Sequence, residues 1–207
     1  MKPALPSSRN GSSLRFRNTL VWTGILFAVA TSTPLRAQDV VLELDPAQTR
    51  IDFTLPEVLR AVHGTFKLKS GTIRFDPATG KASGSVVVDV ASEESDNTSL
   101  DRKLLKEVLD VRKYPEAAFT PFQIDGRLEP QGESPLQLSG TFTLHGRQRD
   151  LMVETTVTRS GHLLNASSHF AINYVDWGLK NPGGVFLRVA NQVQIDLRTV
   201  GRVTPAR

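Results

Sequence analysis

Few side chains of this protein could act as nucleophiles. None of its 207 residues is Cys, which excludes a thiolate nucleophile, a disulfide and a lipid-modified cysteine. The chain also lacks a Gly-x-Ser-x-Gly segment, which would expose a serine at the end of a strand. No Gly-rich loop follows a strand and opens a helix in the way that phosphate binding requires. The motifs therefore indicate neither covalent catalysis nor nucleotide binding.

The histidines are too scattered to hold a metal ion. Metal sites bring several His, Cys or carboxylate ligands to one point. The four histidines show no ligand spacing, and no carboxylate lies between the last two: His63, His145, His162 and His169. Two of them precede a Gly, a pair that is common in turns. We predict no metal site and no cofactor.

Carboxylates are more numerous, and one group of them precedes a segment with helical spacing: Asp89, Glu93, Glu94 and Asp96. Paired carboxyls perform acid–base chemistry when burial separates their pKa values. A polar loop before a helix, however, usually carries solvated acids. Asp176, in Asp176-Trp177-Gly178, is either part of a turn beside a buried ring or a polar contact at the rim of a ligand site.

Most of the chain after residue 38 alternates apolar and polar residues with period two. Such alternation is typical of antiparallel strands with one buried face. Turn signals separate the strands, the strongest being Asp76-Pro77-Ala78-Thr79-Gly80 and His145-Gly146. We expect strands at about 40–44, 51–55, 64–68, 71–75, 84–89, 118–125, 136–144, 151–157, 163–172 and 193–197.

One segment departs from this pattern. Residues 97–114 place a set of apolar side chains on one face of a helix: Leu100, Leu104, Leu105, Val108 and Val111. Pro115 ends the segment, so we predict one helical insertion at about residues 99–112. Its apolar stripe either packs on the sheet as core, the commoner outcome, or forms one wall of a ligand cavity.

The first 37 residues have the composition of a secretory signal peptide. Basic residues precede the apolar run at 20–30, and Ala37 offers a small residue for cleavage. The run is shorter than the roughly 20 residues that a membrane-spanning helix needs. We expect residues 1–37 to be removed, which leaves one domain at 38–207, located in the periplasm and not inserted in the membrane. An uncleaved anchor is the alternative.

The high isoelectric point arises in this leader. Residues 1–37 hold five of the 25 Lys and Arg and none of the 21 Asp and Glu, so residues 38–207 carry 20 positive and 21 negative charges. Binding to nucleic acid requires a clustered positive surface, and no run of like charge is present. We predict no nucleic-acid partner. Many short strands with short turns favour a sandwich or an up-and-down barrel, and spacing alone does not decide between them.

Short motifs, in their order along the chain, resemble the YceI-like family of secreted bacterial proteins. The resemblance extends from about Leu42 to Arg202 and includes Leu44-Asp45-Pro46, Ile51-Asp52-Phe53, Val62-His63-Gly64-Thr65-Phe66, Gly71 to Pro77, Asp96 to Pro115, Phe119-Thr120, Gly140 to Gly146 and Asn173 to Gly178. It implies an all-β fold, an antiparallel eight-stranded lipocalin-like β-barrel carrying the helical insertion. Members of the family hold a long polyisoprenoid chain inside the barrel.

The resemblance implies an apolar ligand without specifying its head group. Leu100 stands where the family has Arg before Asp101, Lys103 where it has His, and Tyr174 where it has Arg. From the alternation we predict an apolar cavity lined by Phe53, Leu55, Phe66, Val86, Val88, Leu104, Leu105, Val108, Phe119, Phe142 and Trp177. Asp101 and Asp176 are the expected polar residues at its rim.

The sequence is compatible with three functions. The first is a periplasmic carrier without enzymatic activity, which holds an isoprenoid-type lipid, polyprenyl or quinone-like, as its partner. The second is an enzyme acting on an amphipathic substrate through Asp101, Asp176 or His145, which requires these groups to converge. The third is a structural or partner-binding barrel filled by its own side chains. A homodimer is left open.

Overall fold

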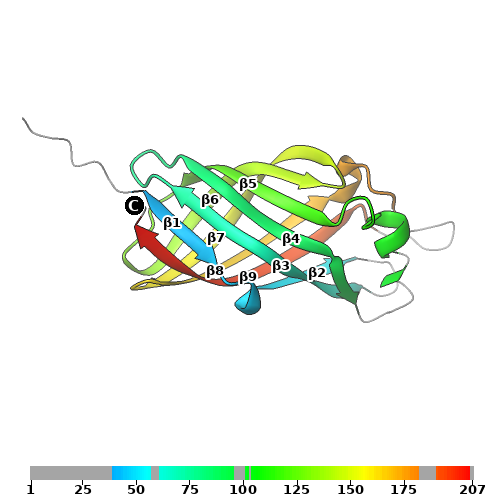
Figure 1. Cartoon of the computed structure of the whole chain (residues 1–207), viewed down its shortest axis with the longest axis horizontal. Coiled ribbons are helices and arrows are strands. Elements are labelled where there is room, and N and C mark those ends of the chain that lie inside the picture. Colours follow the sequence, from blue (N-terminus) through cyan, green and yellow to red (C-terminus); the bar gives the residue numbers. More distant parts are fainter. Residues whose placement is uncertain (1–38, 57–60, 96–100, 103, 182–189, 206–207) are drawn as a thin grey trace, which may run out of the picture. The chain divides into compact units, whose positions relative to one another are not determined.

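The computed structural model describes residues 39–56, 61–95, 101–102, 104–181 and 190–205 (Figure 1). The expected signal peptide at 1–37 lies outside these residues and stays a prediction, as does the domain boundary after it. The described part is built from antiparallel strands. They are β1 (Val40–Leu44), β2 (Arg50–Leu55), β3 (Val62–Phe75), β4 (Ala82–Ser95), β5 (Glu116–Asp125), β6 (Gln131–Leu144), β7 (Arg147–Ser160), β8 (Leu163–Asn173) and β9 (Gln192–Pro205).

The nine strands close into an eight-stranded barrel because β1 and β2 share one position in the wall. Both pair with β3 on one side and with β9 on the other. The one-turn 3₁₀ helix η1 (Pro46–Gln48) interrupts them. Pro46 suits the first position of a helix, and the Asp45 side chain accepts a hydrogen bond from the Ala47 N–H at 2.9 Å. The pairing of β3 with β4 completes the circle, which confirms the predicted fold.

The helical insertion ends earlier than predicted, since Asp101 and Arg102 are helical and the helix ends at Val108. The described helix after Arg102 is the π-helix η2 (Leu104–Val108), in which the Leu109 N–H donates to the Leu104 carbonyl five residues earlier at 2.8 Å. Leu104 and Val108 are both buried. Beyond η2, Asp110 has a positive φ of 45°, which a right-handed helix does not allow, so the helix does not continue to residue 112. Residues 96–100 and 103 of the predicted insertion lie outside the described residues.

The strands are longer than the alternation predicts. The expected strands at 64–68 and 71–75 are one strand, β3, whose pairing with β4 shifts register twice. The predicted turn at Asp76 is confirmed, since the Asp76 carboxylate accepts from the Ala78 N–H at 2.8 Å and Gly80 has φ +72°. At the turn between β6 and β7, His145 and Gly146 both have positive φ, 51° and 73°. This geometry is the one that joins two twisted strands by two residues.

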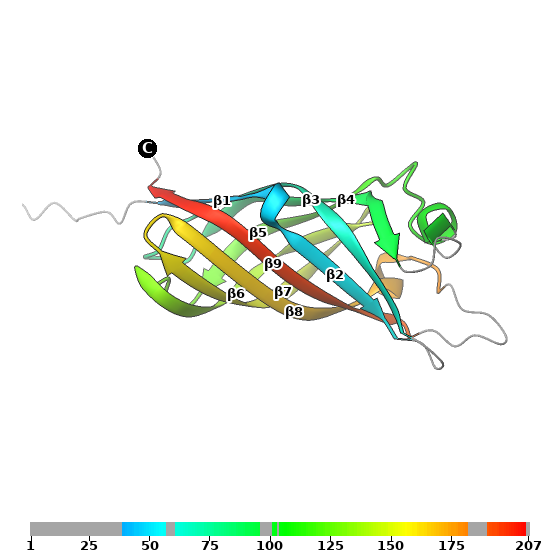
Figure 2. The same cartoon turned by 90° about the horizontal axis from the view of Figure 1, so that it is seen from below.

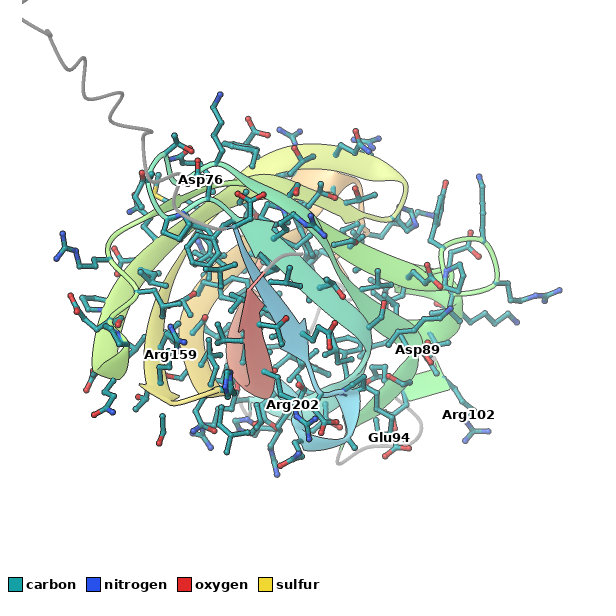
Figure 3. The ribbon with its side chains drawn as sticks, turned by 60° about the vertical axis from the view of Figure 1, so that its left-hand side comes forward. Asp76, Asp89, Glu94, Arg102, Arg159 and Arg202 are labelled. Atoms are coloured by element: carbon teal, nitrogen blue, oxygen red, sulfur yellow. The ribbon has the colours of Figure 1, made fainter. Side chains whose placement is uncertain are left out.

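The buried apolar side chains of the described residues form two clusters in the barrel. One cluster lies at the end that carries η2 and the 3₁₀ helix η3 (Tyr174–Trp177), called the helical end below. Figures 1 and 2 show this end on the right, and the β3–β4 and β7–β8 turns at the opposite end. A second cluster, around Ile73, Leu164 and Val203, lies toward that opposite end. Figure 3 shows the charged side chains of Asp89, Glu94, Arg102 and Arg202 on the outside of the wall.

Candidate ligand-binding cavity

An apolar cavity of about 210 Å³ lies inside the barrel, and members of both clusters form part of its wall. Side chains from all the strands line it, because each strand turns alternate residues inward. Leu42 and Leu44 of β1 and Val86, Val88 and Val90 of β4 show this alternation. All lining residues are apolar except Thr155, Ser168 and Thr199. The interior therefore favours a ligand without polar groups along most of its length.

The three polar lining residues are already hydrogen-bonded to partners in the wall. The hydroxyls of Thr155 on β7 and Ser168 on β8 bond to each other at 2.8 Å. The Thr199 hydroxyl bonds to that of Thr49 at 2.6 Å. Buried hydroxyls that satisfy one another do not require a polar ligand.

The residues predicted from sequence divide into two groups. Five of them lie on the cavity wall: Phe66, Val86, Val88, Phe119 and Phe142. Others are buried in the cluster at the helical end, beside the cavity and not on its wall: Phe53, Leu55, Leu104, Val108 and Trp177. Leu105, on η2, is half-buried. Ligand contact by any of these residues stays a prediction.

Sequence reasoning missed much of the wall. Phe75, Leu138, Leu151, Phe170 and Leu197 all line the cavity. The signal that could have found them is the same alternation, extended from each identified inward residue along its strand in steps of two. Leu138 follows from Phe142 and Leu151 from Val153 in this way.

Trp177 connects the helical end to the cavity. Its ring meets the Phe142 ring edge-on, with 5.7 Å between centroids, and its Nε1 donates to the Phe142 carbonyl at 3.2 Å. The Arg149 guanidinium lies over the Trp177 ring at 6.0 Å. The chain has two Trp, and the other, Trp22, lies in the expected leader. In a protein expressed without residues 1–37, Trp177 fluorescence therefore reports on the surroundings of Phe142.

The structure gives Asp101, Asp176 and His145 separate partners. Asp101 accepts a hydrogen bond from the Ser95 hydroxyl. Asp176 is exposed and accepts from the Asn173 amide at 3.0 Å. His145 stacks near Tyr114, with 4.3 Å between ring centroids, and burial lowers its pKa. Among the described residues, no contact joins the three into one acid–base site.

Glu93 is the one strongly perturbed acid in the described residues. It is 4% exposed, and neither carboxyl oxygen has a hydrogen-bond partner among those residues. A bulge on β4 turns it inward, since pairing with β3 is interrupted between Asp89 and Glu94. Burial, followed by the nearby Asp101 charge, raises the pKa of Glu93 to about 7.

We expect the stability of the barrel to fall as pH rises between about 4.5 and 7. The raised pKa means that folded Glu93 binds its proton more tightly than unfolded Glu93, whose ordinary value is 4.5. Its stabilising contribution is complete below that value and is lost by about pH 7. A one-unit pKa difference corresponds to about 1.4 kcal/mol. Urea unfolding across this range should show the fall.

Glu93→Gln should remove most of this pH dependence. Its neighbour Glu94 is exposed on the outside, and its charge is the smallest of the causes that raise the pKa of Glu93, so Glu94→Gln is the matched control and should reduce the dependence only slightly. An equal effect of the two substitutions would contradict the assignment to Glu93.

Other classes of site receive no support from the described residues. No group of three or more His, Asp or Glu within them could hold a metal ion. In the same part of the chain, no helix combines the length and the apolar composition that crossing a membrane requires.

The YceI-like domain model matches residues 42–200. The chain belongs to the YceI-like family. Among the family's UPF0312 proteins, that of Pseudomonas savastanoi pv. phaseolicola is 28% identical over 165 residues, covering 75% of this chain and 84% of the relative. A UPF0312 protein of Pseudomonas putida strain W619 is 31% identical over 130 residues, covering 59% and 66%.

Solved structures show the same YceI-like fold. BcnA of Burkholderia cenocepacia superimposes with a TM-score of 0.62 at 21% identity, covering 76% of this chain and 98% of that one. A polyisoprenoid binding domain from Saccharophagus degradans, implicated in plant cell wall breakdown, gives 0.62 at 16% identity, covering 79% and 98%. At these identities the similarity shows the fold, and the ligand has to be argued from the cavity.

Proposed function

We propose that this YceI-like protein binds one long apolar lipid of the isoprenoid type inside its barrel and carries it through the periplasm. The observation that carries the proposal is the closed barrel with an apolar interior cavity. Removing one five-carbon isoprene unit from water is worth about 3–4 kcal/mol at roughly 0.8 kcal/mol per carbon. Such a chain does not cross an aqueous compartment unaided, and the apolar interior of a barrel would shield it from water.

Two further facts support this proposal. The barrel from Saccharophagus degradans with the same fold is described as polyisoprenoid binding, which favours that ligand class for this chain. The basic and apolar composition of residues 1–37 favours export. A quinone-like head group is compatible with the neutral charge of residues 38–207. Binding without catalysis is proposed because the lining hydroxyls are already paired.

Titration with prenols of increasing length tests the proposal. The mature protein, stripped of lipid and followed by Trp177 fluorescence, should bind each longer prenol at least ten times more tightly until the cavity is full. A tenfold step corresponds to about 1.4 kcal/mol, well within the transfer free energy of one unit. Affinity that is independent of chain length would contradict an interior site and favour a barrel that serves only as a scaffold.

A further inference from the structure

The barrel wall is not paired evenly around its circumference. β6 and β7 pair along the whole of both strands. β7 and β8 pair only from the turn at Gly161 to Thr155 and Ser168, although both strands are described throughout. The two strands part at Thr155 and Ser168, a point called the fork below. Beyond the fork, residues 147–154 of β7 and 169–173 of β8 form no ladder with each other. Where two neighbouring strands form no ladder with each other, the wall has a seam.

The seam opens directly onto the cavity. Leu151 and Val153 on its β7 side and Phe170 and Ile172 on its β8 side all line the cavity. On the outer lip, the Met152 residue is 59% exposed, an adaptable apolar side chain where a lipid would pass. Two other ladders are broken and then resume: β4 with β5 as a bridge between Lys81 and Gln123, and β3 with β4 at Glu94. At the helical end of the seam, Arg149 Nε donates to the Asp176 carbonyl at 2.8 Å.

A polar groove crosses the outside of the wall at the fork. It shares Leu136, Thr155, Ser168 and Leu197 with the cavity, so one layer of residues separates the two. The hydroxyl pair Thr155–Ser168 stands at the point where the strands part. A lipid that leaves the cavity through the seam therefore meets this groove first.

The groove offers both donors and acceptors of hydrogen bonds. His169 Nδ1 lies 2.8 Å from the Asp196 carboxylate, and Arg198 and Glu154 lie in the same groove. With Asp125 the groove has three carboxylates against one guanidinium. This balance disfavours a phosphate or pyrophosphate head and suits an uncharged head with carbonyl or hydroxyl groups.

We propose that the β7–β8 seam is the portal of the cavity and that the groove at its fork binds the uncharged, hydrogen-bonding head group of the lipid. This inference rests on the proposed function and adds the route and the class of head group. The chain lies in the cavity, and the head emerges sideways through the wall. The described residues at the helical end are packed in an apolar cluster that includes Phe53, Leu104 and Trp177.

Photocrosslinking locates the head group. The probe is the geranylgeranyl ether of 4-hydroxybenzophenone, whose uncharged carbonyl head reacts with neighbouring C–H bonds on irradiation. Its adducts should map to the groove, on residues 154–156 and 167–169. Ser167→Trp, which fills the groove, should lower the adduct yield there at least fivefold. The matched control Asn165→Trp is exposed on the same face of β8 and outside the groove, and should not.

The outcomes separate the two proposals. Adducts at the helical end or at the opposite turns, with the probe bound, would overturn the portal while leaving lipid binding intact. If native mass spectrometry shows no probe bound to the unsubstituted protein, both the proposed function and this inference are wrong.

Release kinetics give an independent test of the seam. Because the chain has no Cys, Glu154→Cys/His169→Cys can be bridged across the fork by a disulfide or by bis-maleimidoethane. Bridging should slow probe release at least tenfold, and reduction of the disulfide should restore the rate. The control pair Thr158→Cys/Asn165→Cys joins the same strands where they are already paired. Equal release rates for bridged and unbridged fork variants would overturn the portal.

Discussion

Phe142→Asp should lower prenol affinity at least about a hundredfold, equivalent to about 2.7 kcal/mol. Phe142 lies on the cavity wall and touches Trp177. An ionised carboxylate there either remains in an apolar interior at a cost of several kcal/mol or draws water along the chain's path. The measurement is the fluorescence titration with wild-type protein alongside.

Two companion variants separate lost binding from lost folding. Thr158→Asp places the same charge on the exposed face of β7, outside the cavity lining, the groove and the seam, and should bind prenol almost as wild type does. Ala166→Phe adds a ring to the cavity wall without a charge, so it should also weaken binding by excluding the chain. Unchanged affinity in both Phe142→Asp and Ala166→Phe, with both proteins folded, would place the ligand elsewhere.

Of the substitutions considered, Phe53→Ala should destabilise the protein most, lowering its free energy of unfolding by about 3–5 kcal/mol. Phe53 is 5% exposed, lies 5.1 Å from Phe66 between ring centroids, and covers Gly64, where even a Cβ would come within 2.4 Å of the Phe53 ring. Removing the ring therefore deletes its packing contacts with Phe66 and Gly64 and leaves a cavity at the helical end. Urea unfolding followed by Trp177 fluorescence measures the change.

Phe119→Ala is the contrasting substitution. Phe119 is half-buried and faces the cavity, so part of its ring already lacks packing partners and its removal should cost less. We expect Phe53→Ala to affect stability more and Phe119→Ala to affect prenol binding more. The reverse order would contradict the division between packed end and cavity wall.

The alternation of apolar and polar residues predicted most of the strands of the fold. It located the strands because a side chain on a strand faces either the core or solvent, and this choice repeats every two residues. It did not reveal that 64–68 and 71–75 are one strand, since the bulge near Ser70 breaks the period while the backbone continues. The closure of the barrel followed from the family resemblance and not from spacing.

The candidate site was less accessible to sequence reasoning. Phe53 and Phe142 have the same residue type and the same inward register, yet one packs the helical end and the other lines the cavity. Only the depth of each along the barrel distinguishes them, and depth depends on the shear of the sheet. Glu93 resembled a solvated loop acid because the bulge that turns it inward has no local signature.

Native mass spectrometry of the mature protein, purified without detergent, tests the central claim most directly. A barrel that holds one lipid should give a population heavier by the mass of that lipid, a few hundred daltons, which organic extraction removes and a prenol of matching length restores. A single species at the mass of the chain alone, unchanged after incubation with polyprenols and quinones, would contradict this claim.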